Sequence, residues 1–108
     1  MPWVFMSLAI VCEVIGTIAL KMSSGLSVMV PSVIVVVGYA SSFWFLAIAL
    51  KSIGIGTAYA IWSGVGTAIV TIAGVMIFKE PLGAVKLLSI GLIILGVVGL
   101  HWAESKLV

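Results

Sequence analysis

The chain is short, at 108 residues, and with 64% hydrophobic and only 7% charged residues it cannot cover the water-facing surface of a soluble domain. The mean hydropathy of +1.46 points the same way, and the length leaves room for one domain without a separate soluble module. The net charge of +2 comes from lysines spread along the chain, so the sequence gives no electrostatic basis for binding nucleic acid.

Four apolar stretches follow one another, each close to the roughly 20 residues that a helix needs to cross a hydrocarbon core of about 30 Å. Their residues do not alternate between apolar and polar, as the strands of a membrane β-barrel would. The sequence therefore predicts an all-α membrane protein with a single four-helix transmembrane domain over residues 1–108 and a solvated tail after residue 102. The expected helices cover about 3–21, 31–50, 57–78 and 86–102.

The first stretch is not expected to be a cleaved signal peptide, because no basic residue precedes it and Glu13 lies in its middle. Cys12, the single cysteine of the chain, lies in the same apolar run, so no disulfide framework is predicted.

Glu13 lies near the middle of the bilayer, where a charged carboxylate costs about 2.5–3.5 kcal/mol on insertion scales. Lys21, the nearest basic residue on the same helix, is about 12 Å farther along the axis and would extend to the interface. An acid in this position binds either a proton or a cation that brings its own charge. The alternative is a neutral carboxyl group that hydrogen-bonds to a neighbouring helix.

The helical face around Glu13 has small residues beside the carboxylate, which leave room for a ligand. Small residues also let helices pack closely, and that alternative stays open. The second stretch offers a further wall at compatible spacing. The candidate substrate-binding residues on these two stretches are Met6, Ala9, Ile10, Gly16, Thr17, Tyr39, Ser42 and Phe43.

The third stretch places Tyr59 and Trp62 on one helical face, with Ser63 beside them. Trp62 lies deeper than the interfacial belts that aromatic residues usually form, so the pair could hold a hydrophobic cation by cation–π attraction of about 2 kcal/mol. Ordinary helix packing is the alternative. The helix is expected to bend at the glycine-rich segment Gly64, Val65 and Gly66.

The fourth stretch carries Gly91 and Gly96 and is interpreted as a packing helix, and His101 near its end is expected to reach the interface. The sequence contains no metal-binding cluster, nucleophile–base pair or phosphate-binding loop. Neither an enzyme nor a protein with a bound metal or cofactor is therefore expected.

The lysines give almost no positive-inside bias across the membrane. A chain without this bias could insert in both orientations, and four helices alone would leave little wall around a substrate path. We therefore predict a homodimer, which dual insertion would allow to be antiparallel; a single topology set by other cues is the alternative. Lys21, Lys79 and Lys86 flank one side, and Lys51, Lys106 and the N-terminal amine flank the other.

The sequence resembles the small multidrug resistance family of bacterial transporters over essentially the whole chain. The residues that carry the resemblance are Glu13-Val14 followed by Lys21, Pro31-Ser32, the block from Ala58 to Gly66, and Gly91-Leu92 with Gly96-Val97-Val98. The resemblance implies an antiparallel dimer of eight helices in the bacterial inner membrane, which exports organic cations in exchange for protons by alternating access.

The same resemblance implies a role for each matching residue. Glu13 would bind proton and substrate in turn, and Tyr39, Tyr59 and Trp62 would form the aromatic part of the site. The kink of the family's third helix falls on the segment 64–66, and its dimer contact in the fourth helix falls on Gly91 and Gly96.

The branch of the family follows from Gly16 and Tyr39, because guanidinium exporters of the family tend to carry a tryptophan and no tyrosine at these two positions. Lys79-Glu80-Pro81 and Gly99-Leu100 look more like the guanidinium branch. Since the residues that would line the site agree with the quaternary-ammonium multidrug branch, we predict that branch. A guanidinium exporter, one subunit of an unequal pair and a cation channel are the alternatives.

Overall fold

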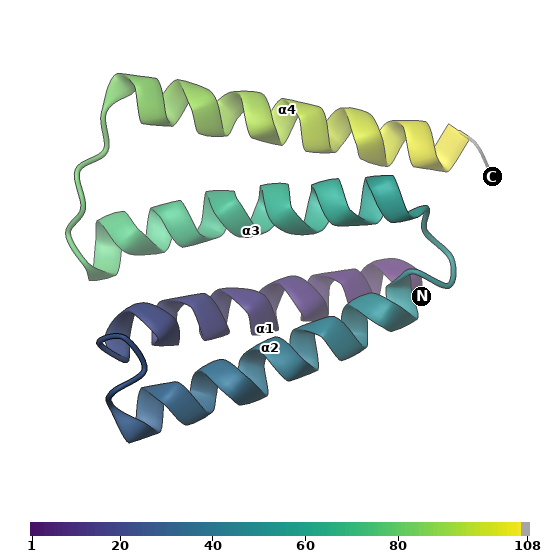
Figure 1. Ribbon diagram of the computed structural model, residues 1–108. Helices are drawn as coiled ribbons and strands as arrows, with labels where there is room; N and C mark the ends of the chain where they lie inside the picture. Colours follow the sequence, from purple (N-terminus) through teal and green to yellow (C-terminus); the bar gives the residue numbers. More distant parts are fainter. Residues whose placement is uncertain (107–108) are drawn as a thin grey trace. The chain divides into compact units, whose positions relative to one another are not determined.

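The computed structural model describes residues 1–106, and only the backbone of Lys106. Each of its helices is long and apolar enough to cross a membrane, so the predicted all-α fold with four membrane-length helices is confirmed. The helices are α1 (Pro2–Met22), α2 (Met29–Ala49), α3 (Ile55–Ile77) and α4 (Ala84–Lys106) (Figure 1).

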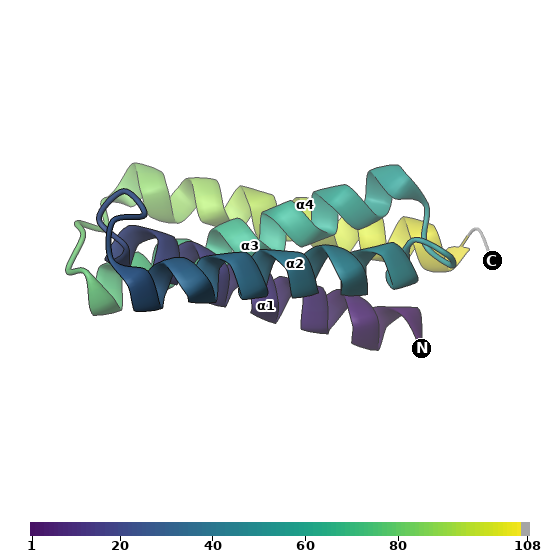
Figure 2. The same ribbon diagram turned by 60° about the horizontal axis from the view of Figure 1, so that its bottom comes forward.

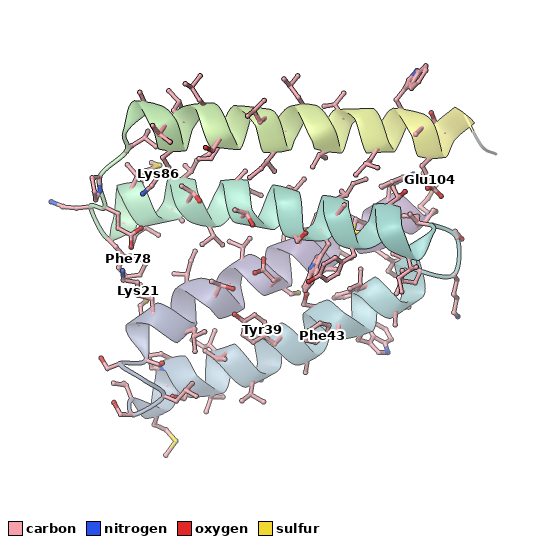
Figure 3. The ribbon with its side chains drawn as sticks, turned by 45° about the horizontal axis from the view of Figure 1, so that its top comes forward. Lys21, Tyr39, Phe43, Phe78, Lys86 and Glu104 are labelled. Atoms are coloured by element: carbon pink, nitrogen blue, oxygen red, sulfur yellow. The ribbon has the colours of Figure 1, made fainter. Side chains whose placement is uncertain are left out.

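The helix ends differ most from the prediction at the end of α4, which continues past residue 102 to Lys106. On this last turn, Glu104 reaches back to the start of α3, where its Oε2 accepts the backbone N–H of Gly54 at 3.1 Å (Figure 3). Residues 103–106, which the sequence predicted to lie in a solvated tail, therefore form the last turn of α4, and Glu104 contacts the start of α3. Residues 107 and 108 of that predicted tail lie outside the described part of the chain.

The chain divides into two compact units, Met1–Ser52 and a second that begins at Ile53. Each unit is a hairpin of two antiparallel helices, with α1 along α2 in the first and α3 along α4 in the second (Figure 2). The joining of both hairpins in a single transmembrane domain stays a prediction.

Two glycines bring α1 and α2 together. A Cβ atom added to Gly38 would lie 3.1 Å from the carbonyl oxygen of Cys12 and 3.1 Å from the Cα of Gly16. The missing side chains let the two backbones approach closely, as is common between membrane helices. One turn farther along α2, the buried hydroxyl of Ser42 donates a 2.7 Å hydrogen bond to the carbonyl oxygen of Ala9 and adds a polar contact to this packing.

In the second hairpin, α3 packs on α4 at Gly64. A Cβ atom there would lie 2.9 Å from Cγ2 of Val97 and 3.1 Å from Cγ2 of Ile93, so this glycine makes room for branched side chains of α4. The helix is continuous through residues 64–66. Close packing accounts for Gly64, and a functional bend at this segment stays a prediction.

A left-handed residue ends α3. Lys79 has a φ of 55°, and this turn lets the backbone N–H of Glu80 reach the carbonyl oxygen of Gly74 at 3.1 Å. Lys79 thus takes the left-handed conformation that commonly follows the last turn of a helix, where glycine is the usual residue. The carboxylate of Glu80 folds back over Gly74, where a side chain would leave it no space.

Candidate functional site

Glu13 is a residue of α1 in the first hairpin, and the two oxygens of its carboxylate have different surroundings. Oε1 accepts a 2.9 Å hydrogen bond from the hydroxyl of Thr17, one helical turn farther along. Oε2 is buried and has no hydrogen-bond partner among the described residues. An unpartnered buried carboxylate oxygen is costly unless it takes a proton or a positive charge.

Tyr39 of α2 extends this contact across the hairpin. Its phenolic oxygen lies 2.7 Å from Oγ1 of Thr17. Because the single hydroxyl proton of Thr17 goes to Glu13, Tyr39 must be the donor in the second bond. The resulting relay runs from Tyr39 through Thr17 to Oε1 of Glu13, and Figure 3 shows where Tyr39 lies along α2.

Gly16 provides the space in which Tyr39 lies. A Cβ atom at this position would be 3.2 Å from both Cδ1 and Cε1 of the tyrosine ring. This is tighter than ordinary van der Waals contact, so the ring rests almost on the backbone of α1. The glycine, which the sequence suggested as open space beside the carboxylate, is therefore filled by Tyr39 in this hairpin.

The other predicted residues of the first hairpin do not join the relay. Met6, Ala9 and Ile10 are buried, and the hydroxyl of Ser42 donates to the backbone of α1. Phe43 is 56% exposed (Figure 3). The structure thus brings Glu13, Thr17 and Tyr39 together out of a longer list of candidates.

The predicted aromatic pair is present in the second hairpin. The ring centroids of Tyr59 and Trp62 are 5.7 Å apart, with 51° between the ring planes. Ser63 donates a 2.8 Å hydrogen bond to the carbonyl oxygen of Tyr59, so its hydroxyl is occupied by its own helix. Tyr59 is 61% exposed, which leaves much of its surface open to a ligand or a neighbouring chain.

The sequence indicates only that Thr17 is a small residue that leaves space beside Glu13. The structure shows that Thr17 also donates a hydrogen bond to Glu13, a role that was not predicted. The spacing of four residues along one helix was the available signal, because such side chains face each other. The link to Tyr39 had no such signal, since it joins residues on different helices.

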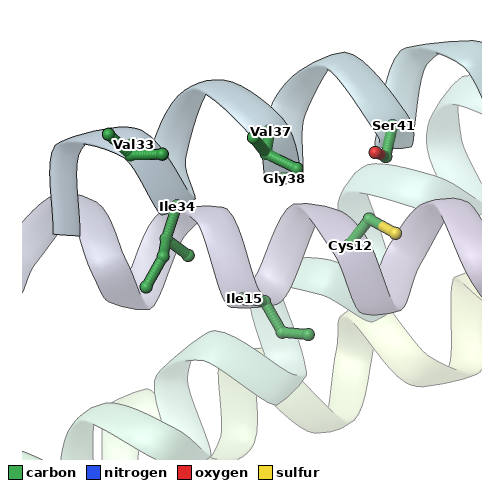
Figure 4. Close-up of a pocket in the computed structure, with 7 residues that line it drawn as sticks. All are labelled: Cys12, Ile15, Val33, Ile34, Val37, Gly38 and Ser41. Carbon is green, nitrogen blue, oxygen red and sulfur yellow. The ribbon is translucent and has the colours of Figure 1, made fainter. Parts of the chain in front are cut away.

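An apolar groove between α1 and α2 is a separate feature of the first hairpin (Figure 4). Glu13, Thr17 and Tyr39 are not among the residues that line it, so this groove is not the carboxylate site. The lining residues are Cys12, Ile15, Val33, Ile34, Val37, Gly38 and Ser41.

Comparison with known proteins gives matches over most of the chain. The family model described as Small Multidrug Resistance protein matches residues 1–93. The chain is 46% identical to the quaternary ammonium compound-resistance protein QacE of Escherichia coli over 99 residues, which cover 92% of this chain and 90% of that protein. It is 42% identical to the guanidinium exporter of Yersinia pestis over 104 residues, which cover 96% of this chain and all of that protein.

A third relative, the uncharacterized membrane protein YvaE of Bacillus subtilis, is 46% identical over 104 residues, which cover 96% of this chain and 87% of that protein. Similarity of this extent, together with four membrane-length helices, makes the chain a multi-pass bacterial membrane protein with a transport role. The chain belongs to the small multidrug resistance family, whose members include drug-resistance proteins and cation exporters.

Proposed function

We propose that this protein exports hydrophobic or quaternary ammonium cations in exchange for protons, with Glu13 as the group that binds both. The observation that carries the proposal is the buried Oε2 of Glu13, which has no hydrogen-bond partner among the described residues of a membrane-length helix. A carboxylate in apolar surroundings needs a compensating positive charge, which either a proton or an organic cation supplies.

Exclusive occupancy of Glu13 couples the two fluxes. While a cation is bound, the carboxylate stays ionised, and while a proton is bound, it has no charge to attract the cation. Alternating access then carries a cation one way and protons the other, because only an occupied site crosses at low cost. Tyr59 and Trp62 would add cation–π attraction for the hydrophobic part of the substrate.

An antiparallel homodimer in the inner membrane, with dual topology, is the assembly that we propose for this cycle. The spanning part of α4 has no buried residue, and Cβ atoms on Gly91 and Gly96 would meet no described atom within 4 Å. This leaves an apolar surface with small residues, of the kind that membrane helices use to associate. The nearly even division of lysines between the two sides supports insertion in both orientations.

The test is transport by the purified protein in liposomes. An outwardly directed proton gradient should drive uptake of the cation, and an inwardly directed gradient should not. The wild type should accumulate tetraphenylphosphonium when the gradient favours exchange, and Glu13→Gln should abolish this uptake. Glu80→Gln is the matched control, because it makes the same chemical change in the loop after α3 and should transport normally. Gradient-driven uptake by Glu13→Gln equal to that of the wild type would refute the proposal.

A guanidinium exporter is the second candidate, since the chain is similar both to a guanidinium exporter and to a quaternary ammonium compound-resistance protein. Uptake of guanidinium and tetraphenylphosphonium by the same liposomes decides between the two candidates. A strong preference for guanidinium would assign the chain to the guanidinium branch and not to the quaternary-ammonium multidrug branch. Resistance of cells to a cationic biocide with this chain expressed alone would argue against an unequal pair. Bilayer currents that need no proton exchange would instead indicate a channel.

A further inference from the structure

We propose that Thr17 and Tyr39 give the two carboxylate oxygens of Glu13 different roles. They hold Oε1 as a permanent hydrogen-bond acceptor, so that Oε2 is the atom that exchanges a proton for a cation. This inference rests on the proposed function and adds to it the reacting atom and the residues that position it. Thr17 and Tyr39 are positioning residues here, because they act on the carboxylate and not on the cation.

The direction of the relay assigns the oxygens. The hydroxyl of Thr17 donates to Oε1 at 2.9 Å, and the phenol of Tyr39 must donate to Thr17 at 2.7 Å. A proton that binds Oε2 leaves both bonds intact, because Oε1 is then the carbonyl oxygen of the acid and still accepts. A proton on Oε1 would require both hydroxyl groups to turn and both bonds to break or reverse.

The surroundings of Oε2 agree with this assignment. Oε2 is buried and lacks a hydrogen-bond partner among the residues that the structure describes, whereas Oε1 has one. A buried oxygen that accepts no hydrogen bond is stabilised most when it binds a proton or a cation, and Oε2 is that oxygen.

Gly16 makes the relay possible. The tyrosine ring lies over this glycine, with two ring carbons 3.2 Å from the position that a Cβ atom would take. Any side chain at residue 16 would push the ring away from α1 and lengthen the bond between Tyr39 and Thr17. Gly16 is thus a further positioning residue, two steps removed from the carboxylate.

Few other titratable groups in this hairpin bear on Glu13. Tyr39 is the sole titratable side chain within Met29–Ala49, the helix packed against α1. On α1 itself, Cys12 is adjacent in sequence and Lys21 is about 12 Å along the axis. Within the described part of the hairpin, therefore, the relay supplies the hydrogen bond that the carboxylate accepts.

Removal of the relay has a signature that depends on pH. A hydrogen bond to a carboxylate favours its charged form, so without the relay a proton should compete more effectively with the cation for the site. The pH midpoint of cation binding should rise by about one unit, which weakens binding about tenfold below the midpoint. Well above the midpoint protons no longer compete with the cation, and affinity should be nearly unchanged. A residue that simply contacts the cation would lower the affinity at every pH.

The experiment measures tetraphenylphosphonium binding by calorimetry across a pH series, with the full-length protein in lipid nanodiscs. Tyr39→Phe removes the terminal hydroxyl and keeps the ring, and Thr17→Val removes the link at similar volume. Thr71→Val is the matched control, because its hydroxyl donates at 2.7 Å to the carbonyl oxygen of Thr67 within α3. Both relay variants should raise the pH midpoint, and the control should not.

A double-variant cycle tests the part played by Gly16. Gly16→Ala should raise the midpoint in the wild-type background and should have little further effect when combined with Tyr39→Phe, because the bond that it disturbs is already absent. Equal effects of Gly16→Ala in both backgrounds would show that this glycine does not act through the tyrosine hydroxyl.

Infrared difference spectra between acidic and alkaline pH test the oxygen assignment without any substrate. The carbonyl stretch of protonated Glu13 is identified by its loss in Glu13→Gln. If the proton is on Oε2, Thr17→Val removes a hydrogen bond from the carbonyl oxygen Oε1 and shifts this band to higher frequency. An unmoved band would overturn the assignment.

The proposed function and the assignment of the two oxygens can be refuted separately. Binding by the wild type that requires Glu13 and depends on pH, with unchanged midpoints in both relay variants, would overturn the inference and leave the proposed function standing. Binding that does not require Glu13 would remove the proposed function, and the infrared band would still test the oxygen assignment.

Discussion

Substitution of Gly38 by alanine should weaken the first hairpin, because the new methyl group would meet backbone. A Cβ atom there would lie 3.1 Å from the carbonyl oxygen of Cys12 and 3.2 Å from the backbone nitrogen of Gly16. Ordinary contact begins at about 3.4–4 Å, so α1 and α2 would have to separate by several tenths of an ångström. A flexible side chain could rotate away from the methyl group, but these helix backbones cannot.

The size of the effect follows from two opposing terms. Overpacking of a close interface costs about 1–3 kcal/mol. Replacing glycine by alanine within a helix contributes up to about 1 kcal/mol in the opposite direction. The net destabilisation of Gly38→Ala relative to the wild type should therefore be about 0–2 kcal/mol, and about 1–3 kcal/mol relative to the same substitution at an uncrowded helix position.

The assay is reversible unfolding in mixed micelles by increasing dodecyl sulfate, followed by circular dichroism. Gly56→Ala is the control, because Gly56 also lies in a helix and a Cβ atom on it would meet no described atom within 4 Å. The difference between the two variants isolates the packing term from the helix propensity. Equal stability of Gly38→Ala and Gly56→Ala would refute the reasoning from close backbone contact.

Two further predictions concern the second hairpin. Glu104→Gln should destabilise the second hairpin by about 0.5–1 kcal/mol, because a neutral group replaces the charged acceptor of the Gly54 N–H at the start of α3. The same unfolding assay measures this loss of stability. Ser105→Ala is the control, because it leaves the contact between Glu104 and Gly54 intact. Lys79→Gly should stabilise the end of α3 by about 1 kcal/mol, because its φ of 55° suits glycine better than a residue with a Cβ atom, and slower amide exchange at Glu80 would show it. Faster exchange there would contradict this explanation of the turn.

Much of the fold could be predicted from the sequence because the relevant signals are local. The length and hydropathy of each stretch predicted four membrane helices, and their centres were correct even where the ends differed by a few residues. Glu13 could be singled out in the same way, since an acid in the middle of an apolar run has a large cost in lipid wherever the other helices lie.

The ends of α3 and α4 were harder to predict, because they depend on capping contacts that the local composition does not reveal. Glu104 lies 50 residues beyond Gly54 in the sequence, and nothing near either residue indicates that they meet. The polar turn after residue 102 resembled a solvated tail for that reason.

The amino-acid sequence by itself determined the class of the protein, the number of its spanning helices and the acid on which its proposed function depends. Only the tertiary structure decided that Tyr39 joins Thr17 and Glu13 in one hydrogen-bonded relay. That depends on Tyr39 reaching Thr17 across the hairpin, over a glycine that leaves room for the ring. Apolar periodicity is a property of one helix, whereas a hydrogen bond between helices depends on their separation and rotation to within a fraction of an ångström.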